Sequence, residues 1–389
     1  MTATSTKPQA NSNYKAAPAT PQAKFATARQ EMADALVERE GEIDLVLTAL
    51  LAGENPLMVG DPGTAKSMLI TSLLAWMPGL QKFDWQLNKF TAPEELFGPV
   101  SLPSLKAGRY ERVTTGKLPT AHLAFLDEIF KASSAILNTT LRALNEHVYE
   151  NGSGPQPIPL RLCMAAANEW PSDQEGGKEL GALFDRFLLR KKVKPISSRA
   201  GRDRLLNLAR INGGKPALPN FSCHLTLEEL DQAQAEALEL EWTEEAEAGY
   251  SQILDTLIKE GIRPGDRRMY KALKCVNAYA YLCGAQQCEL EHLEVLQYIL
   301  WNDPTEQPEK CAQVVAKIAN PVGMAVNSLL LQAEDVIAKA TPAEAVPKLK
   351  TLQDAMKKLK PDARRDRAIQ HLAGEIKKAY NRVIGVDME

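Results

Sequence analysis

A run of eight residues, from Gly60 to Ser67, reads Gly-Asp-Pro-Gly-Thr-Ala-Lys-Ser, a pattern typical of a loop that binds a phosphate chain. Its glycines permit backbone angles that point several N–H groups at one anion, and the helix expected after it adds partial positive charge at its N-terminus. In such loops the lysine, here Lys66, reaches the β- and γ-phosphates, and the hydroxyl of Ser67 ligates Mg²⁺. The general pattern has glycine where this chain has Ala65, and we interpret that methyl group as a mild departure. The predicted nucleotide-binding residues of this loop are Gly60, Asp61, Pro62, Gly63, Thr64, Ala65, Lys66, Ser67 and Met68.

Polar residues also follow two later apolar stretches. Asp127 and Glu128 come directly after Leu123–Leu126, sixty residues beyond the phosphate loop, and Asn168 follows a second apolar run. At the tip of a strand beside the loop, Asp127 would hold Mg²⁺ through its water shell and Glu128 would orient and polarise the attacking water. An amide at the position of Asn168 would hold the same water near the γ-phosphate. These residues predict hydrolysis of a nucleoside triphosphate.

Arginines supply the remaining charge for such chemistry. Arg186 lies at an expected junction between a helix and a strand, where it would face the γ-phosphate of an adjacent subunit better than its own, and Arg190 is the alternative for that role. Arg267 and Arg268 begin a helix after Pro264-Gly265, so one of them could fold back onto the nucleotide when a helical lid closes. We favour Arg267 as the catalytic contact and place Arg268 among the nucleotide-binding residues.

The elements that must position these residues alternate between short apolar runs and helical patterns, which favours a parallel sheet with helices on both faces. The strands are expected at 56–59, 83–87, 123–126, 160–166 and 187–193. The helices are expected at 32–52, 66–77, 133–145 and about 177–183. Beyond about residue 197 only helical patterns remain. We therefore predict four regions: a disordered tail (1–25), an αβα nucleotide-binding domain (26–198), an all-α lid (199–308) and a helical C-terminal extension (309–389).

Composition excludes several classes of protein. The formal net charge of −3 lacks the excess of positive charge that is typical of a nucleic-acid-binding protein. The longest apolar runs are shorter than a membrane-spanning helix requires. The six cysteines include no C-x-x-C pair, so a zinc site is not expected, and no secretory signal is visible, which favours a cytoplasmic protein. Charge is nevertheless uneven: residues 226–260 carry eleven acids and one base, whereas residues 346–389 carry eleven bases and six acids. These are either solvated helix faces or docking surfaces for a partner or a neighbouring subunit.

Taken together, the motifs resemble those of an AAA+ ATPase: Walker A at Gly60–Ser67, Walker B at Asp127-Glu128, sensor 1 at Asn168, the arginine finger at Arg186 and sensor 2 at Arg267-Arg268. The branch resembles MoxR, and within it the RavA-type members. Five further stretches carry that resemblance: Thr91–Pro99, Gly108–Gly116, Phe125–Ala132, Ile136–Asn138 and Ala143–Glu146. The resemblance covers about residues 30–305.

The resemblance implies a P-loop fold with a five-stranded parallel sheet and an all-α lid, which binds ATP and Mg²⁺ and works as a hexameric ring. It also implies remodelling or activation of a protein substrate, often with a von Willebrand A-domain (vWA) partner. In this branch Tyr149–Arg161 resembles a hairpin inserted before sensor 1, and Phe97–Thr115 resembles an insert near helix 2; both are candidate substrate contacts.

Other functions fit the residues less well. Asn88-Lys89-Phe90-Thr91 imitates the guanine-binding N-K-x-D motif but has threonine in place of the acid, which argues against a GTPase. A small-molecule kinase would lack Asn168, Arg186 and the lid. Two alternatives stay open. The first is a nucleic-acid-associated AAA+ motor, which only the basic tail supports. The second is an ATP-binding scaffold with little turnover, and the complete set of Walker residues argues against it.

Overall fold

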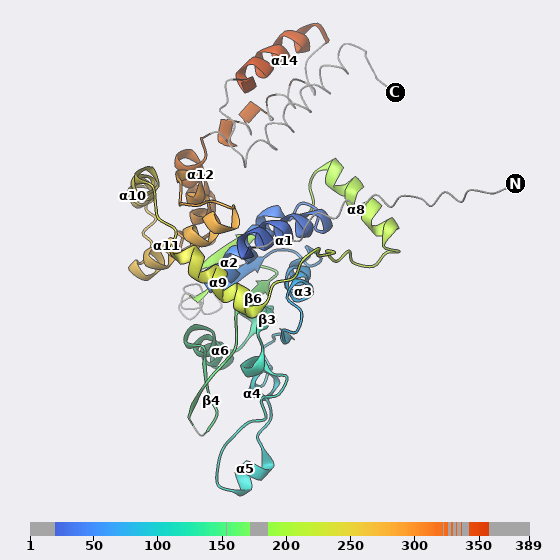
Figure 1. Ribbon diagram of the computed structural model, residues 1–389, viewed down its shortest axis with the longest axis vertical. Helices are drawn as coiled ribbons and strands as arrows, with labels where there is room; N and C mark the ends of the chain where they lie inside the picture. Colours follow the sequence, from blue (N-terminus) through green and yellow to red (C-terminus); the bar gives the residue numbers. More distant parts are fainter. Residues whose placement is uncertain are drawn as a thin grey trace, which may run out of the picture.

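The computed structural model describes residues 20–152, 154–171 and 186–321, together with parts of 323–357. At its centre is a parallel five-stranded sheet in the order β2-β3-β6-β1-β7 (Figure 1). The strands are β1 (Pro56–Val59), β2 (Lys82–Gln86), β3 (Leu123–Asp127), β6 (Leu162–Ala167) and β7 (Leu189–Lys192). Because β1 and β6 occupy the interior of the sheet, every residue in them is buried. The predicted αβα fold with a five-stranded parallel sheet is confirmed.

Each face of the sheet is covered by its own apolar layer, because successive side chains of a strand point to opposite faces. Met58 faces a layer built with α1 (Pro21–Ala35), α2 (Glu40–Ala52) and α3 (Lys66–Trp76), whereas its neighbours Leu57 and Val59 face the other layer. That second layer is formed with α4 (Pro93–Phe97), the short 3₁₀ helices η1 (Leu118–Thr120) and η2 (Ile129–Lys131), and α6 (Ser134–Glu146).

The N-terminal helices differ from the prediction in two ways. Helix α1 begins at Pro21, inside the region predicted as a disordered tail, because the Thr20 side chain accepts a hydrogen bond from Ala23 N and caps the helix. The single helix expected over 32–52 is two helices, interrupted at 36–39, where Glu38 adopts a left-handed backbone conformation (φ 53°). The helix expected at about 177–183 lies outside the described residues.

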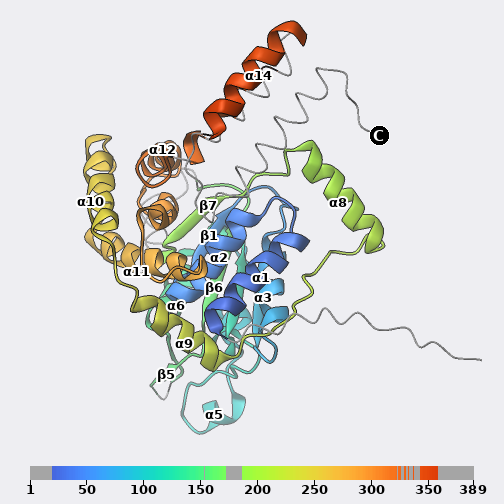
Figure 2. The ribbon, with the colours of Figure 1, turned by 45° about the horizontal axis from the view of Figure 1, so that its top comes forward.

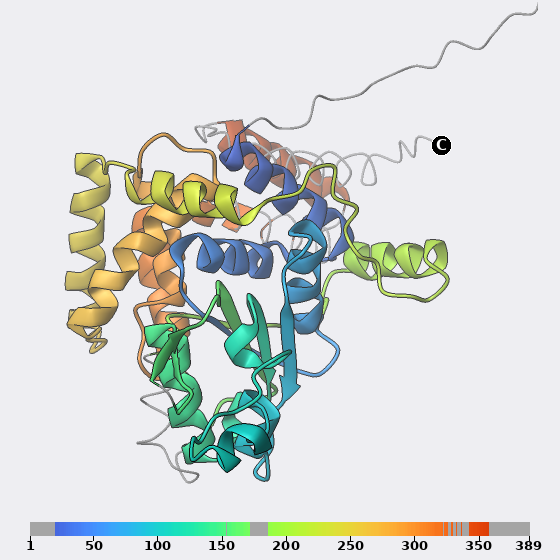
Figure 3. The ribbon, with the colours of Figure 1, turned by 60° about the horizontal axis from the view of Figure 1, so that its bottom comes forward.

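Helices beyond the sheet continue the core of the nucleotide-binding domain. They are α9 (Leu227–Leu238), α10 (Glu244–Lys259), α11 (Asp266–Leu282), η3 (Leu290–Tyr298) and α12 (Gln307–Ala319). Of these, α9 and α11 pack on α1 and α2, η3 packs on α11, and α10 and α12 pack on η3. One hydrophobic cluster runs without a break from Phe25 through Leu230 and Val276 to Val315. Figure 3 shows these helices beside α2 on one side of the molecule. The predicted lid therefore shares its core with the nucleotide-binding domain.

Three parts project from this body (Figures 1 and 2). Helix α8 (Arg199–Ile211) extends to one side, and α14 (Pro342–Lys357) lies in the predicted C-terminal extension. An excursion carrying α5 (Leu102–Lys106) lies at the far end, near the antiparallel hairpin of β4 (Val148–Glu150) and β5 (Pro155–Pro157). Among the described residues, no helix is long and apolar enough to cross a membrane.

Candidate active site

The predicted phosphate loop connects β1 directly to α3, as its sequence indicated. Gly60 is required there by close approach, because a Cβ atom at this position would lie 2.3 Å from the carbonyl oxygen of Val193. Gly63 has φ 80° and Ala65 has φ 66°, both in the left-handed region. The alanine that departs from the general pattern thus occupies a conformation that favours glycine, at a cost of about 1–2 kcal/mol for a residue with a Cβ atom.

The Lys66 side chain is folded into this loop. Its ammonium group donates hydrogen bonds to the carbonyl oxygens of Gly60 and Asp61, the latter at 3.2 Å. Burial lowers the pKa of Lys66 below its ordinary value, and the carboxylates of Asp127, Glu128 and Asp61 oppose that shift. A partly buried cation beside weak carbonyl acceptors is well placed to bind a stronger anion, such as a phosphate.

The polar residues predicted at the strand tips meet beside the loop. β3 pairs with β6, and β6 pairs with β1, so the carboxyl ends of the three strands lie at one edge of the sheet. There the amide of Asn168 donates to Oε1 of Glu128 at 2.5 Å, and the same oxygen accepts from Lys131 Nζ at 3.0 Å. Glu128 is buried and has a left-handed backbone (φ 54°), which turns its chain away from the strand direction immediately after Asp127.

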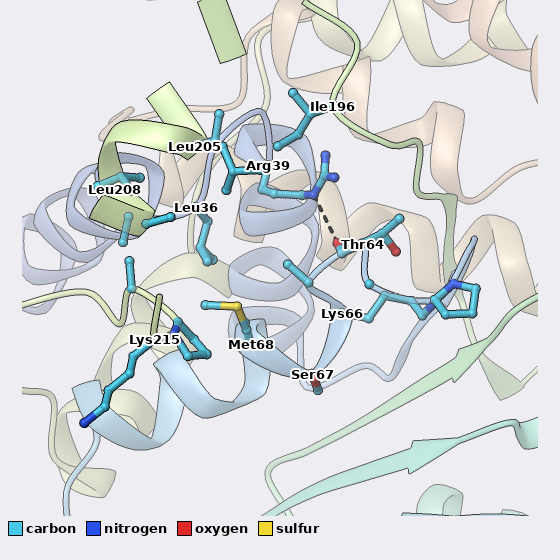
Figure 4. Close-up of a pocket in the computed structure, with 18 of the residues that line it drawn as sticks. Leu36, Arg39, Thr64, Lys66, Ser67, Met68, Ile196, Leu205, Leu208 and Lys215 are labelled. Atoms are coloured by element: carbon cyan, nitrogen blue, oxygen red, sulfur yellow. Dashed lines mark hydrogen bonds between the residues drawn. The ribbon is translucent and has the colours of Figure 1, made fainter. Parts of the chain in front are cut away.

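A cavity of about 670 Å³ is lined by the loop from Pro62 to Met68 and by Asp127, Glu128 and Asn168. Figure 4 shows Lys66, Ser67 and Met68 in its wall. This volume lies within the usual range of sites for small ligands and cofactors. One end is polar and is formed by the loop with Asp127, Glu128 and Asn168. The other end is apolar, and three segments of the chain contribute to its wall. Its apolar residues are Leu36 and Val37 from the first segment, Met68 from the second, and Ile196, Leu205 and Leu208 from the third. The cavity therefore offers a phosphate end and an apolar end with room for a purine base.

Arg39 is a site residue that sequence reasoning missed. Its side chain is buried, and its Nε donates to the carbonyl oxygen of Thr64 at 3.1 Å (Figure 4). The neighbouring Glu38 points elsewhere: its carboxylate accepts hydrogen bonds from the backbone N–H groups of Ser197 and Ser198 at the start of α8. The pKa of Glu38 is lowered mainly by the hydrogen bond that its carboxylate accepts from the Ser198 hydroxyl. The two backbone hydrogen bonds lower it further. Nothing about a lone Glu-Arg pair in a predicted helix signals either contact.

Mg²⁺ is the metal that the predicted chemistry requires, and the donor set suits it. Ser67 and Asp127 both border the polar end of the cavity and supply a hydroxyl and a carboxylate oxygen. Mg²⁺ prefers such hard oxygen ligands and commonly takes one or two from the protein and the rest from phosphates and water.

Arg186 lies far from this cavity in its own chain. It precedes β7, whose Leu189 is paired with Pro56 at the start of β1, whereas the phosphate loop begins after the end of β1. Four residues of strand separate the two levels by about 13 Å along the sheet. Arg186 is half-buried, and within the described part of the chain its Nε is buried without a hydrogen-bond partner.

Arg190, the alternative to Arg186, is enclosed within its own subunit. Its guanidinium lies 3.9 Å from the centre of the Trp301 ring and donates to the carbonyl oxygens of Ile299 and Trp301. It is 1% exposed and cannot be presented to a neighbouring copy.

The two arginines at the start of α11 are not brought to the cavity. Arg268 is buried and donates to the carbonyl oxygen of Trp301 and to Oδ1 of Asn302, both at 2.5 Å. It therefore ties α11 to the segment that follows η3, away from the cavity, and its role as a nucleotide contact stays a prediction. Arg267 is exposed, and neither residue is among the described residues that line the cavity.

The two predicted inserts lie against one another at the far end of the molecule. The side chain of Asn151, in the hairpin turn, accepts from Arg112 N at 2.7 Å and donates to Arg112 O at 3.2 Å. Leu102 and Tyr110 of the α5 excursion are strongly exposed. The inserts thus meet in one joint tip, whose exposed large apolar side chains come from the α5 excursion.

Comparison with known proteins places this geometry in a family. Residues 23–231 match the model of the MoxR domain in the MoxR–vWA–β-propeller ternary systems, and residues 251–315 match an AAA lid domain. Two uncharacterized proteins of Methanocaldococcus jannaschii are each 38% identical, over 300 residues (75% of each chain) and over 277 residues (71% of this chain and 69% of the relative). The crystal structure of a candidate ATPase from Cytophaga hutchinsonii is similar in fold, with a TM-score of 0.61 at 16% identity, covering 77% of this chain and 95% of that one.

Proposed function

The chain belongs to the MoxR family of AAA+ ATPases, and on this premise we propose that it hydrolyses ATP in a ring of identical subunits to remodel or activate a protein partner. The observation that carries the proposal is the convergence of Lys66, Asp127, Glu128 and Asn168, from three adjacent strand ends, on one cavity with an apolar far end. A phosphate chain fits the polar end and a purine fits the apolar one.

Each residue has a defined part in the proposed reaction. The loop N–H groups and Lys66 hold the β- and γ-phosphates, while Ser67 and Asp127 hold Mg²⁺, which would neutralise charge on the phosphate oxygens. Glu128 accepts a proton from a water molecule that Asn168 helps to orient. That water attacks the γ-phosphorus, the bond to the bridging oxygen breaks, and ADP leaves. The Asn168–Glu128 contact shows that both side chains reach the same point.

We propose that Arg186 completes the site of a neighbouring copy. This is supported by its distance from its own phosphate loop and by the burial of Arg190. An arginine supplied in this way is worth about 10³–10⁵ in rate. Arg267 is exposed and does not line the cavity in this arrangement, and we propose that it reaches the phosphates when the lid closes.

The partner is proposed from the family. The RavA-type branch stays a prediction from sequence motifs, whereas the matched model is described by ternary systems that contain a vWA protein and a β-propeller. We therefore propose a vWA-domain protein as the partner and the joint tip of the two inserts, with exposed Leu102 and Tyr110, as its contact or that of the substrate.

Two variants test the enzymatic proposal by release of inorganic phosphate. Lys66→Ala should lose ATP binding, because the cation facing the phosphates is removed. Glu128→Gln should bind ATP without hydrolysing it and should retain a vWA-domain protein in affinity capture. Hydrolysis by Glu128→Gln at the parental rate would show that Glu128 is not the base, and an inactive parental protein that binds ATP would favour the scaffold alternative.

A mixture of two inactive proteins tests the shared site. Lys66→Ala has an intact Arg186, and Arg186→Ala has an intact phosphate loop, so some interfaces of a mixed ring contain both. Activity should partly return on mixing. An Arg186→Ala protein that hydrolyses ATP at full rate would contradict the role of Arg186.

A further inference from the structure

Helix α8 carries apolar side chains that are exposed in the described part of the chain. It is fastened near its start, where the side chain of Ser198 caps it and Arg204 donates to the carbonyl oxygens of Ala33 and Asp34. The rest projects from the body in all three ribbon views (Figures 1–3). Leu205, Leu206 and Ile211 are 48%, 57% and 79% exposed. Apolar residues gathered on an exposed helix mark an interaction surface.

The outward face of α8 has a regular pattern. Arg202, Leu206 and Arg210 are four residues apart, so they form one ridge on the helix, and the two arginines are separated by about 12 Å along its axis. All three side chains are exposed. Arg202 donates to the carbonyl oxygen of Ser197, which uses only part of its donor capacity. No carboxylate of the described residues forms an ion pair with either arginine. We call Arg202, Leu206 and Arg210 the basic ridge.

Helix α10 presents the complementary pattern. It buries Ala246, Gly249, Ile253 and Leu257 against the body, so the opposite side of the helix faces outward. On that side Glu247, Ser251 and Asp255 are exposed, again four residues apart, with the two acids about 12 Å from one another. Neither acid forms an ion pair with a cation in the described part of the chain. We call Glu247, Ser251 and Asp255 the acidic ridge.

The two ridges cannot meet within one molecule. The views of Figures 1–3 differ only by rotation about the horizontal axis, which leaves left and right unchanged, and in each view α8 lies at the right and α10 at the left. Contact between them must therefore join two copies. Because the surfaces differ, such a contact is head-to-tail, and repetition of one head-to-tail contact closes into a ring when the rotation allows.

We propose that the basic ridge of one copy docks on the acidic ridge of the next. Arg202 and Arg210 then pair with Asp255 and Glu247 in either helix direction, because both ridges have the same spacing, and Leu206 packs over the small Ser251.

This docking rests on the proposed ring ATPase and specifies how the ring is held together. Leu205 and Leu208 of α8 line the ATP cavity, so each docked interface adjoins one site. On the opposite side of the molecule, α10 packs on η3, whose carboxyl end is bonded by Arg190, four residues after Arg186. The same contact thus brings the α10 side of one copy next to the cavity of the next.

Charge reversal in the full-length protein tests the docking by sedimentation velocity with ATP and Mg²⁺, in a Glu128→Gln background that prevents turnover. One protein carries Arg202→Glu and Arg210→Glu, and the other carries Glu247→Arg and Asp255→Arg. Each alone should stay monomeric at concentrations at least about tenfold above those at which the parental protein assembles, because like charges then face one another. A one-to-one mixture should assemble again, because every interface of an alternating ring has opposite charges.

Circular dichroism of each variant confirms that it is folded. A matched control, Glu241→Arg with Glu245→Arg, makes the same charge change near the start of α10 but off the acidic ridge, and it should assemble normally. Normal assembly of both ridge variants would overturn the docking and leave the ring ATPase intact, and so would a mixture that stays monomeric. A parental protein that hydrolyses ATP but never assembles would overturn both the ring and the docking.

Discussion

Replacement of Arg39 by methionine tests whether the residue that only the structure revealed controls the phosphate loop. The methionine side chain fills much of the same volume but cannot donate the hydrogen bond from Arg39 Nε to the carbonyl oxygen of Thr64, which is 3.1 Å long. It also loses the bond from Nη1 to the carbonyl oxygen of Glu38, at 2.6 Å. The side chain is buried, so water cannot replace these donors freely.

The expected magnitude follows from the Thr64 bond. A hydrogen bond from a charged donor contributes about 1.5–3 kcal/mol. If the bond holds the loop in its binding conformation, its loss lowers the population of that conformation and raises the apparent Kd for ATP by the same factor. The lower end of the range corresponds to about a tenfold weaker affinity, because 1.4 kcal/mol is tenfold. We therefore expect the Kd for ATP to rise by about tenfold or more.

Titration of a fluorescent ATP analogue measures the affinity, and thermal denaturation measures stability in parallel. Arg29→Met is the matched control, because Arg29 is also partly buried and its Nε lies 2.5 Å from Oδ1 of Asp44, away from the phosphate loop. Both variants should be less stable, but only Arg39→Met should bind ATP more weakly. An Arg39→Met protein with unchanged Kd and the same loss of stability as Arg29→Met would refute the role of Arg39 at the loop.

Three further outcomes are expected. Ala65→Gly removes the cost of a left-handed alanine (φ 66°) but adds the entropy cost of glycine. Thermal denaturation should therefore show a protein that is about 0–1 kcal/mol more stable, and this protein should still bind ATP. A large loss of stability would contradict the left-handed conformation of residue 65. Because burial lowers the pKa of Lys66, the unfolded chain binds more protons than the folded one between the folded pKa and 10.5, and the unfolding free energy should rise with pH across that window. Urea titrations should show this rise in the parental protein and a smaller one in Lys66→Met. Removal of Mg²⁺ with EDTA should stop phosphate release while leaving measurable ATP binding, because Lys66 and the loop N–H groups contact the phosphates directly; hydrolysis that persists without the metal would contradict the roles of Ser67 and Asp127.

Much of the phosphate end of the site could be predicted because its chemistry is local. A strand, a glycine-containing turn and a helix N-terminus are consecutive in the chain, so the position of Lys66 follows from Gly60–Ser67 alone. Asp127, Glu128 and Asn168 each end an apolar strand, and parallel strands bring their carboxyl ends to one edge of the sheet. The prediction that these strands are parallel was therefore enough to expect these side chains at one edge of the sheet.

The roles of the arginines could not be predicted in the same way. Arg190 and Arg268 read as free cations in the sequence, but both are buried against Trp301, far away along the chain. Their environment depends on how η3 packs on β7 and α11, and no local pattern encodes that packing.

What the sequence by itself determined is the set of contacts made within a few residues or imposed by the parallel sheet: the phosphate loop, the strand-tip acids and the alternation of helices and strands. Only the tertiary structure decided the rest. It placed Arg39 on the loop, joined the lid helices to α1 and α2 in one core, and left the two charged ridges of α8 and α10 on opposite sides of the molecule. The physical reason is that the apolar periodicity of a helix determines which of its faces is buried. The segment that covers this face is determined by complementarity of shape and charge between parts of the chain that are far apart in sequence.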